Sequence, residues 1–113
     1  MSLKISVNSK NEAERLICIL NVGITTCLQE GLISIEEAEN YLYSLHSMDI
    51  LKDAGLDSNV IDLIHLGSEL ENVERIIPDE LEKSVEEIGQ KSKSALKDLP
   101  RPELPVKKWI DAK

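Results

Sequence analysis

One short motif recurs through this chain and marks where helices begin. It is Ser-x-x-Glu, and it occurs at Ser9–Glu12, Ser34–Glu37, Ser68–Glu71 and Ser84–Glu87. In this spacing the serine hydroxyl accepts a hydrogen bond from the backbone N–H three residues later, while the glutamate reaches back to the serine. Apolar residues three or four apart accompany most of these motifs, as they do in helices with one buried face. The sequence therefore predicts a small all-α protein.

Size and composition limit what such a protein can enclose. The chain has 113 residues, which is enough for one hydrophobic core. Apolar residues make up 42% and aromatic residues 3%, with no Phe, so the core must be built from Leu, Ile, Val and Ala. These side chains interdigitate between facing helices, whereas pockets for organic cofactors are usually lined by several aromatic residues. We therefore expect a bundle of five to six helices and no cofactor.

The pattern divides the chain into three parts. Residues 1–8 form an N-terminal extension that starts like an expression remnant and, over residues 3–7, alternates apolar and polar side chains as a short strand does. Residues 9–99 carry the helical periodicity and form the domain. Residues 100–113 are basic and contain three prolines, which predicts an extended Pro-rich tail.

Glycine, proline and capping residues set the expected helix boundaries. The expected helices run from Ser9 to Gly31, from Ser34, from near Ser47 to Gly55, from Asp57 or Ser58 to a kink or break at Gly67, from the capping box at Ser68 to Pro78, and from Pro78 onward. Ile19 and Val22 leave the first of these helices only a thin polar side. We therefore expect other helices to pack around most of it.

The last helix carries an apolar seam with a seven-residue repeat. The seam consists of Leu81, Val85, Ile88, Ala95 and Leu99. Such a seam packs either on its own bundle or on a second copy of itself. A homodimer joined through these residues, with the role of a self-associating structural protein, therefore stays an alternative.

Charge is distributed unevenly along the chain, whose net charge is −8. Residues 30–87 hold 16 acidic and 3 basic side chains, and residues 88–113 hold 3 acidic and 7 basic ones. An acidic surface repels phosphate backbones, so we expect no nucleic-acid partner. The chain has neither an apolar run of transmembrane length nor a secretory signal. We therefore expect a cytoplasmic protein without a membrane partner.

Two cysteines lie on the first predicted helix. Cys18 and Cys27 are nine residues apart, which puts them on opposite faces and about 13 Å apart along the helix axis. They therefore do not bridge each other. We expect two buried, unreactive thiols in a reducing compartment.

One side-chain pattern suggests a metal site. Asp62, His65 and Glu69 step by three and four along one helical face, a spacing from which ligands can converge on a divalent cation. Di-iron bundles need a second carboxylate-x-x-His motif, but Tyr43 occupies the acidic position before His46. No nucleophile–base set and no phosphate-binding glycine loop is evident. We therefore expect no enzyme, catalytic residue or metal site, with a metal-dependent or hydrolytic enzyme at these three residues as the alternative.

The acidic helical face and the tail remain as candidate binding elements. The candidate contact residues are Glu36, Glu37, Glu39, Glu69, Glu71, Glu74 and Trp109. Pro102-Glu-Leu-Pro105 has the outline of a polyproline ligand, and Trp109 beside two lysines would anchor a partner. Alternatively, the tail folds over the acidic surface of its own chain and covers Trp109. The leading hypothesis is a non-enzymatic interaction module, immunity-like or regulatory, that binds a basic protein partner.

Three segments resemble a known family. They are Gly31-Leu-Ile-Ser-Ile-Glu-Glu-Ala-Glu39, His65-Leu-Gly-Ser-Glu-Leu-Glu-Asn-Val73 and Ile76-Ile-Pro78. The family consists of short bacterial proteins known only as a domain of unknown function. The matching residues are helix caps and core positions, so the resemblance implies a bacterial cytoplasmic helical domain and identifies no catalytic residue.

Overall fold

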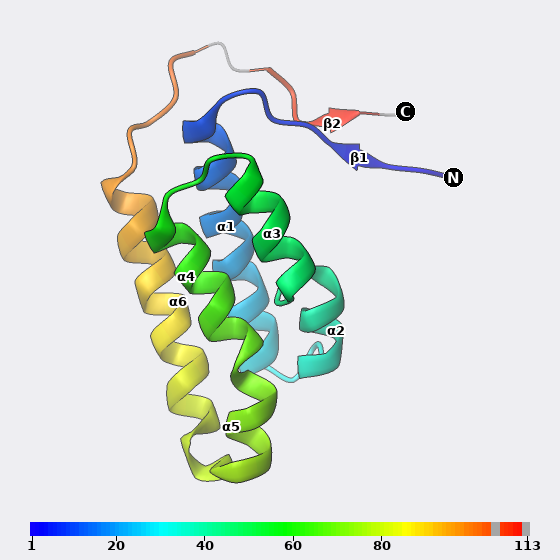
Figure 1. The fold of residues 1–113 in the computed structure, drawn as a ribbon, viewed down its shortest axis with the longest axis vertical. Helices are drawn as coiled ribbons and strands as arrows, with labels where there is room; N and C mark the ends of the chain where they lie inside the picture. Colours follow the sequence, from blue (N-terminus) through cyan, green and yellow to red (C-terminus); the bar gives the residue numbers. More distant parts are fainter. Residues whose placement is uncertain (105–106, 112–113) are drawn as a thin grey trace.

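The chain forms a bundle of helices with a short two-stranded sheet at one end (Figure 1). The computed structural model describes residues 1–104 and 107–111. In chain order the elements are β1 (Lys4–Ile5), α1 (Lys10–Gln29), α2 (Ile35–Tyr41), α3 (Leu45–Asp53), α4 (Ser58–Ser68), α5 (Leu70–Ile76), the 3-10 turn η1 (Pro78–Glu80), α6 (Leu81–Asp98) and β2 (Ile110–Asp111). The prediction of a mostly helical, all-α protein is confirmed. Several of these helices are short, and the finer count of five to six bundle helices is not confirmed.

Helix α1 begins where the first motif predicts. The Ser9 hydroxyl accepts a hydrogen bond from the N–H of Glu12 at 3.1 Å. The helix ends just before Gly31, whose φ of +69° lies in the left-handed region that glycine adopts easily. It runs antiparallel to α6 and packs along it (Figure 1). The buried face of α1 holds Glu14, Ile17, Cys18, Asn21 and Thr25.

The opposite face of α1 is open to solvent. Ile19 and Leu20 are 41% and 37% exposed, so the prediction that other helices surround most of α1 is wrong. Helices α4 and α6 pack on α1, and these two side chains stay partly exposed at the edge of that packing. An apolar strip is thus left uncovered.

Serine caps fix the starts of α2 and α3. The Ser34 hydroxyl accepts from the N–H of Glu37 at 3.0 Å, as its motif predicts. The expected start of α3 near Ser47 is wrong by about one turn, because the cap is Ser44, whose hydroxyl accepts from the Ser47 N–H at 3.1 Å. The helix ends before Gly55, which has a φ of +85°, as predicted.

The two later Ser-x-x-Glu motifs do not start helices. Ser68 is the last residue of α4, and its hydroxyl donates to the carbonyl of His65 at 2.6 Å. Ser84 lies inside α6, because Pro78 and η1 have already begun the helical turns. A serine cap requires an extended backbone at the serine, and both of these serines are helical.

Gly67 marks a close contact rather than the predicted kink. It lies within α4, and the break falls two residues later, at Glu69. A Cβ atom at Gly67 would lie 2.4 Å from the ring of Tyr43, so the ring packs directly against the helix backbone. Because Tyr43 follows α2 in the chain, this contact holds α2 near the junction of α4 and α5.

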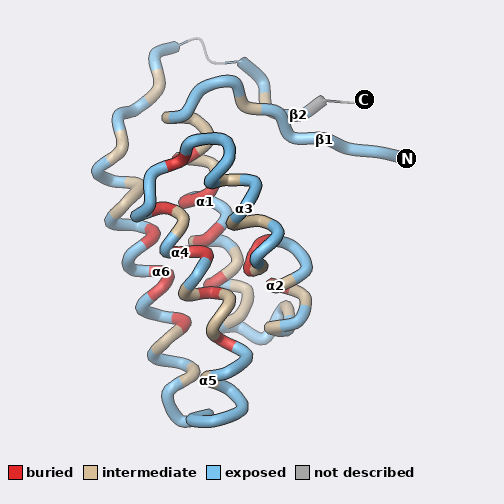
Figure 2. Tube along the Cα trace, in the orientation of Figure 1, coloured by how far each residue is buried: buried red, intermediate tan, exposed pale blue. Residues whose placement is uncertain are grey.

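The core is mainly aliphatic, as the composition predicts, with Tyr43 also buried in it. Figure 2 shows buried positions along the inner sides of α1, α4 and α6. The apolar seam of α6, namely Leu81, Val85, Ile88, Ala95 and Leu99, packs in or against this core. Val85 and Ile88 are only 5% and 2% exposed. The seam therefore packs within its own bundle, and a homodimer joined through these residues stays a prediction.

The two ends of the chain meet in a short antiparallel sheet. Ile5 of β1 pairs with Ile110 of β2, and the Ser6 N–H donates to the Trp109 carbonyl at 2.8 Å. The strand predicted within residues 3–7 is therefore present in a shorter form.

The segment after α6 has no helix or strand over residues 100–104. The predicted extended Pro-rich tail is not confirmed, and its Pro105 and Val106 lie outside the described residues. The division into residues 1–8, 9–99 and 100–113 stays a prediction.

Candidate functional site: an acidic groove

Two short helices bring most of the predicted acidic residues together. Helix α2 begins after the Ser34 cap, so Glu36 and Glu39 lie three residues apart on one face. Glu71 and Glu74 have the same spacing on α5. Helices α2 and α5 contact each other, so acidic side chains from distant parts of the chain become neighbours.

Glu39 lies against Glu71 across this contact. Partial burial, followed by the adjacent Glu71 carboxyl group and the charge of Glu36, raises the pKa of Glu39. Neighbouring carboxylates disfavour each other's ionised form. A positive group placed here would relieve that repulsion.

A groove adjoins these carboxylates where α2, α5 and α6 meet the end of α1. Its volume is about 560 Å³. The apolar side chains that form its floor are buried or half-buried, and they are Leu28, Ile33, Ile35, Leu81 and Val85. The exposed Glu36, Glu74 and Glu82 form its rim, and neither Lys nor Arg is among its lining residues. We call this site the acidic groove. An apolar floor with an acidic rim is complementary to an apolar segment that carries positive charge.

The other two predicted carboxylates, Glu37 and Glu69, contact side chains outside the acidic groove. The Tyr41 hydroxyl donates to Glu37 Oε2 at 2.7 Å. Glu69 Oε1 lies 3.4 Å from His65 Nε2 on the exposed surface of α4. The acidic site is therefore smaller than the set of residues that the sequence suggested.

Trp109 lies at the far end of the molecule, against the start of α1. It is half-buried, and its Nε1–H points to Glu12 Oε1 at 3.4 Å. Nearby, the Asn11 side-chain amide donates to the Pro100 carbonyl at 2.9 Å. This packing agrees with the alternative in which Trp109 is covered by its own chain, although the covering surface is not the acidic groove.

Asp62, His65 and Glu69 do not converge. Within residues 1–104 and 107–111, no three His, Cys, Asp or Glu side chains are placed to hold a metal ion. His65 approaches Glu69, whereas Asp62 lines a separate shallow groove together with Lys91. A metal-dependent enzyme at these residues therefore has no geometric support.

The cysteines are free and differ in burial. Cys18 is fully buried, and this burial, assisted by the charge of Glu14, raises its pKa to about 11. Such a thiol stays protonated and unreactive near neutral pH. Cys27 is only half-buried, so the expectation of two buried thiols is correct for Cys18 alone.

Sequence reasoning missed Glu82 and the groove floor. Leu28 and Leu81 follow the helical periodicity and were indistinguishable from core positions. Their positions at helix ends were nevertheless a signal for a groove, because Leu28 lies in the last turn of α1 and Leu81 is the first residue of α6. The ends of a bundle cover their apolar stripes least.

The comparisons with known proteins concern the family and not the activity. In the described part of the chain, no helix is both long enough and apolar enough to cross a membrane. No curated protein and no solved structure matches the chain. A family model described as "Protein of unknown function (DUF3969)" matches residues 8–111, which confirms the resemblance to a domain family of unknown function. The chain therefore belongs to this DUF3969 family.

Proposed function

We propose that this protein is a non-enzymatic interaction module, of the immunity or regulatory kind, that binds a basic protein partner in the acidic groove. The supporting observation is the arrangement of Glu36, Glu74 and Glu82 around an apolar floor that no Lys or Arg lines. The bacterial, cytoplasmic setting expected from the sequence is part of this proposal.

The electrostatics of the site favour a cation. The pKa of Glu39 is raised first by partial burial and then by the nearby Glu71 carboxyl group. A Lys or Arg side chain of the partner therefore replaces the repulsion between these carboxyl groups with attraction. Such complementarity increases the association rate and is screened by salt, with a Debye length of about 10 Å at 0.1 M. Binding should therefore weaken as ionic strength rises.

The shape of the site favours a segment of a partner rather than a small molecule. The lining of the groove comes from α1, α2, α5 and α6, so its apolar floor would accept apolar anchors and its rim the charges that flank them. Interfaces commonly concentrate their binding energy in a few such anchored side chains. We therefore expect a partner segment with one or two apolar side chains between Lys or Arg residues.

A charge-matched pair of variants tests this proposal. In the first, Glu36→Lys and Glu74→Lys reverse the groove rim. In the control, Asp49→Lys and Asp53→Lys make the same change of net charge on the exposed surface of α3. Wild type, variant and control are immobilised and exposed to extract of the native host at low and high salt, and captured proteins are identified by mass spectrometry.

The expected result is a basic protein that the wild type and the control retain at low salt. The groove variant should bind the purified partner at least about tenfold more weakly by calorimetry, because two attractive contacts become repulsive. Equal binding by all three proteins, or capture that is insensitive to salt, would contradict the proposal. So would a partner that carries no basic surface.

A further inference from the structure

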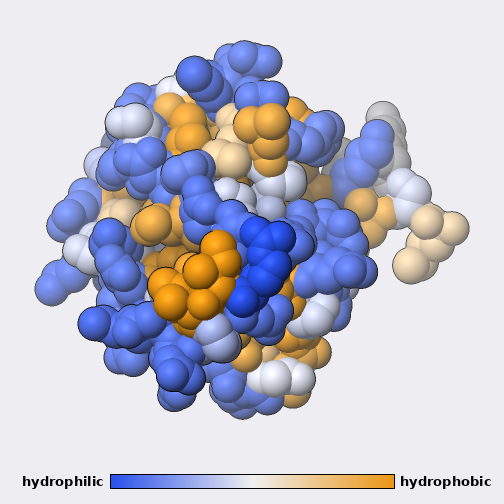
Figure 3. Space-filling view, turned by 60° about the horizontal axis from the view of Figure 1, so that its bottom comes forward, coloured by the Kyte–Doolittle hydropathy of each residue, from blue (hydrophilic) through white to orange (hydrophobic). Residues whose placement is uncertain are grey.

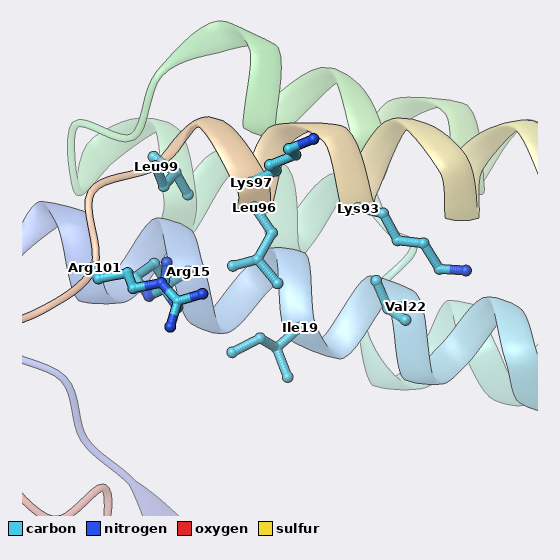
Figure 4. A pocket seen from close by; sticks show the side chains of 8 residues that line it. All are labelled: Arg15, Ile19, Val22, Lys93, Leu96, Lys97, Leu99 and Arg101. Atoms are coloured by element: carbon cyan, nitrogen blue, oxygen red, sulfur yellow. The ribbon is translucent and has the colours of Figure 1, made fainter.

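A second groove lies between α1 and α6, on the face of α1 that the other helices leave open (Figure 4). Its volume is about 510 Å³. The floor is apolar: Ile19 and Val22 come from α1, Leu96 from α6, and Leu99 from the residue that follows α6. Figure 4 shows Leu96 pointing across the helix contact toward Ile19. We call this site the α1–α6 groove.

The rim of the α1–α6 groove carries only positive charge. It consists of Arg15, Lys93, Lys97 and Arg101, and neither Asp nor Glu is among the lining residues. Across the described ranges, none of these four side chains takes part in an ion pair. Four of the 13 Lys and Arg residues of a protein with net charge −8 therefore surround one apolar floor without compensation. Such a surface attracts an apolar group that is flanked by carboxylates.

An apolar group with neighbouring carboxylates lies at the other end of the same molecule. Where α5 turns into η1, Ile76 and Ile77 are 67% and 53% exposed. Figure 3 brings this end forward and shows a hydrophobic patch within a hydrophilic surface. Pro78 follows Ile77 and restricts the backbone of the turn, and the exposed Asp79 and Glu80 come next, while the exposed Arg75 precedes Ile76. We call this surface the α5–η1 corner.

We infer that copies of this chain associate head to tail, with the α5–η1 corner of one copy seated in the α1–α6 groove of the next. Ile76 and Ile77 contact the apolar floor, while Asp79 and Glu80 meet the cations of the rim. The corner protrudes and the groove is hollow, so the two shapes are compatible. A flat lipid surface fits less well, because the apolar groups of the groove lie between helices rather than on a protruding face.

The symmetry of this contact has a specific consequence. Its two surfaces differ, so each dimer still exposes one free groove and one free corner, and association continues into longer assemblies. The inference does not depend on the proposed function, because it uses different residues from the rim of the acidic groove.

Association should be weak and should not be suppressed by moderate salt. Each copy carries a net charge of −8, and the groove is small compared with stable interfaces. The shortest dimension of the molecule is 27 Å, whereas the Debye length is about 8 Å at physiological ionic strength. Salt therefore screens repulsion between whole molecules more than it screens ion pairs in contact.

Sedimentation velocity on the full chain, from micromolar to millimolar concentration at physiological ionic strength, tests the inference. The sedimentation coefficient of the wild type should rise with concentration. Lys93→Glu with Lys97→Glu should lower the association constant by at least about tenfold, because attraction becomes repulsion at the rim. The control, Lys4→Glu with Lys52→Glu, makes the same charge change outside the groove and should lie within about twofold of wild type. Circular dichroism verifies that each variant keeps its helix content.

A mixing experiment distinguishes head-to-tail contact from a symmetric dimer. Ile76→Ser with Ile77→Ser disables the corner, and K93E/K97E disables the groove, so each variant alone should be monomeric. Their mixture retains one intact contact and should form a heterodimer that grows no further. A monomeric wild type at all concentrations, or a mixture that does not associate, would overturn the inference. Binding of monomeric wild type to anionic lipid vesicles, lost in K93E/K97E, would also overturn it by assigning the groove to a membrane surface.

Discussion

The acidic groove and the α1–α6 groove lie toward opposite ends of the pair formed by α1 and α6. Each groove has an aliphatic floor, but their rims differ in charge. Their volumes are similar, about 560 and 510 Å³. Glutamates form one rim, and Lys and Arg form the other. The comparison shows that one bundle can present two apolar grooves whose rims carry opposite charge.

The direction of α6 contributes to the charge of each groove. The first half of this helix is rich in Glu, and its second half contains Lys91, Lys93 and Lys97. Acidic residues near a helix N-terminus and basic residues near its C-terminus are both favoured by the helix dipole. Because α1 runs antiparallel, its last turn faces the acidic half and its first half faces the basic one. An arrangement that stabilises a single helix therefore also contributes to the sign of each groove, together with Glu36 and Glu74 at one end and Arg15 and Arg101 at the other.

The largest predicted effect is a loss of stability at the end of the bundle that carries the acidic groove. Gly67→Ala places a Cβ atom 2.4 Å from the Tyr43 ring, and the ring cannot move without shifting the connection between α2 and α3. We expect the free energy of unfolding to fall by about 3 kcal/mol, as in other overpacked cores. Urea denaturation measures this loss.

A second glycine provides the control. At Gly89 in α6, a new Cβ atom would lie 3.0 Å from Thr25 Oγ1, and alanine gains about 1 kcal/mol of helix propensity over glycine. These two effects oppose each other, so Gly89→Ala should stay within about 1 kcal/mol of wild type. Equal losses in both variants would show that the Tyr43 contact does not hold α2 in place.

An intermediate loss of stability is predicted at the end of the bundle that carries the α1–α6 groove. Glu14 is 3% exposed, and its Oε2 accepts from the Asp57 N–H at 2.6 Å, which ties the start of α4 to α1. Glu14→Ala leaves that donor without its partner and should cost about 2 kcal/mol in urea denaturation. Glu14→Gln keeps an acceptor oxygen and should cost about 1 kcal/mol or less. If both variants lost the same stability, the negative charge rather than the hydrogen bond would hold this end together.

The smallest predicted effect is on the pH dependence of stability near the acidic groove. The pKa of Glu39 is raised above its ordinary value of 4.5, so the folded state holds this proton more tightly than the unfolded state. Its stabilising contribution is present below the ordinary pKa and is lost as the pH rises through the raised value. Glu71→Gln removes the neighbouring charge and should move the pKa of Glu39 toward its ordinary value.

Carboxyl-detected NMR titration measures this shift. Glu86→Gln, on the exposed surface of α6, serves as the control and should leave the titration of Glu39 unchanged. A pKa that stays the same in Glu71→Gln would attribute the shift to partial burial and the charge of Glu36. The close approach of α2 and α5 carboxylates would then lose its support.

Local signals predicted much of this fold. Ser9 and Ser34 cap helices as their motifs indicate, because the first turn of a helix depends on nearby residues. Ser68 and Ser84 fail because tertiary packing and the preceding proline decide where the later helices begin. The role of Gly67 was invisible for the same reason, since its partner Tyr43 comes from a distant part of the chain.

The sites were predictable only in part. The sequence identified the carboxylates of α2 and α5 because charge is a property of residue type. It did not identify either groove floor, because a floor exists only where helices from distant segments leave a gap between them. Arg15 of α1 and Lys93 of α6 line the same groove, and no local pattern connects them.

The pairing of β1 with β2 brings Lys4 opposite Asp111, so the first and last described segments of the chain lie side by side and away from the α5 end of the bundle (Figure 1). A short peptide linker between them, with new termini opened in the exposed turn at Gly55, would give a circular permutant of the same bundle. In that permutant, fluorophores at the new termini would report on opening between α3 and α4 without touching the acidic groove.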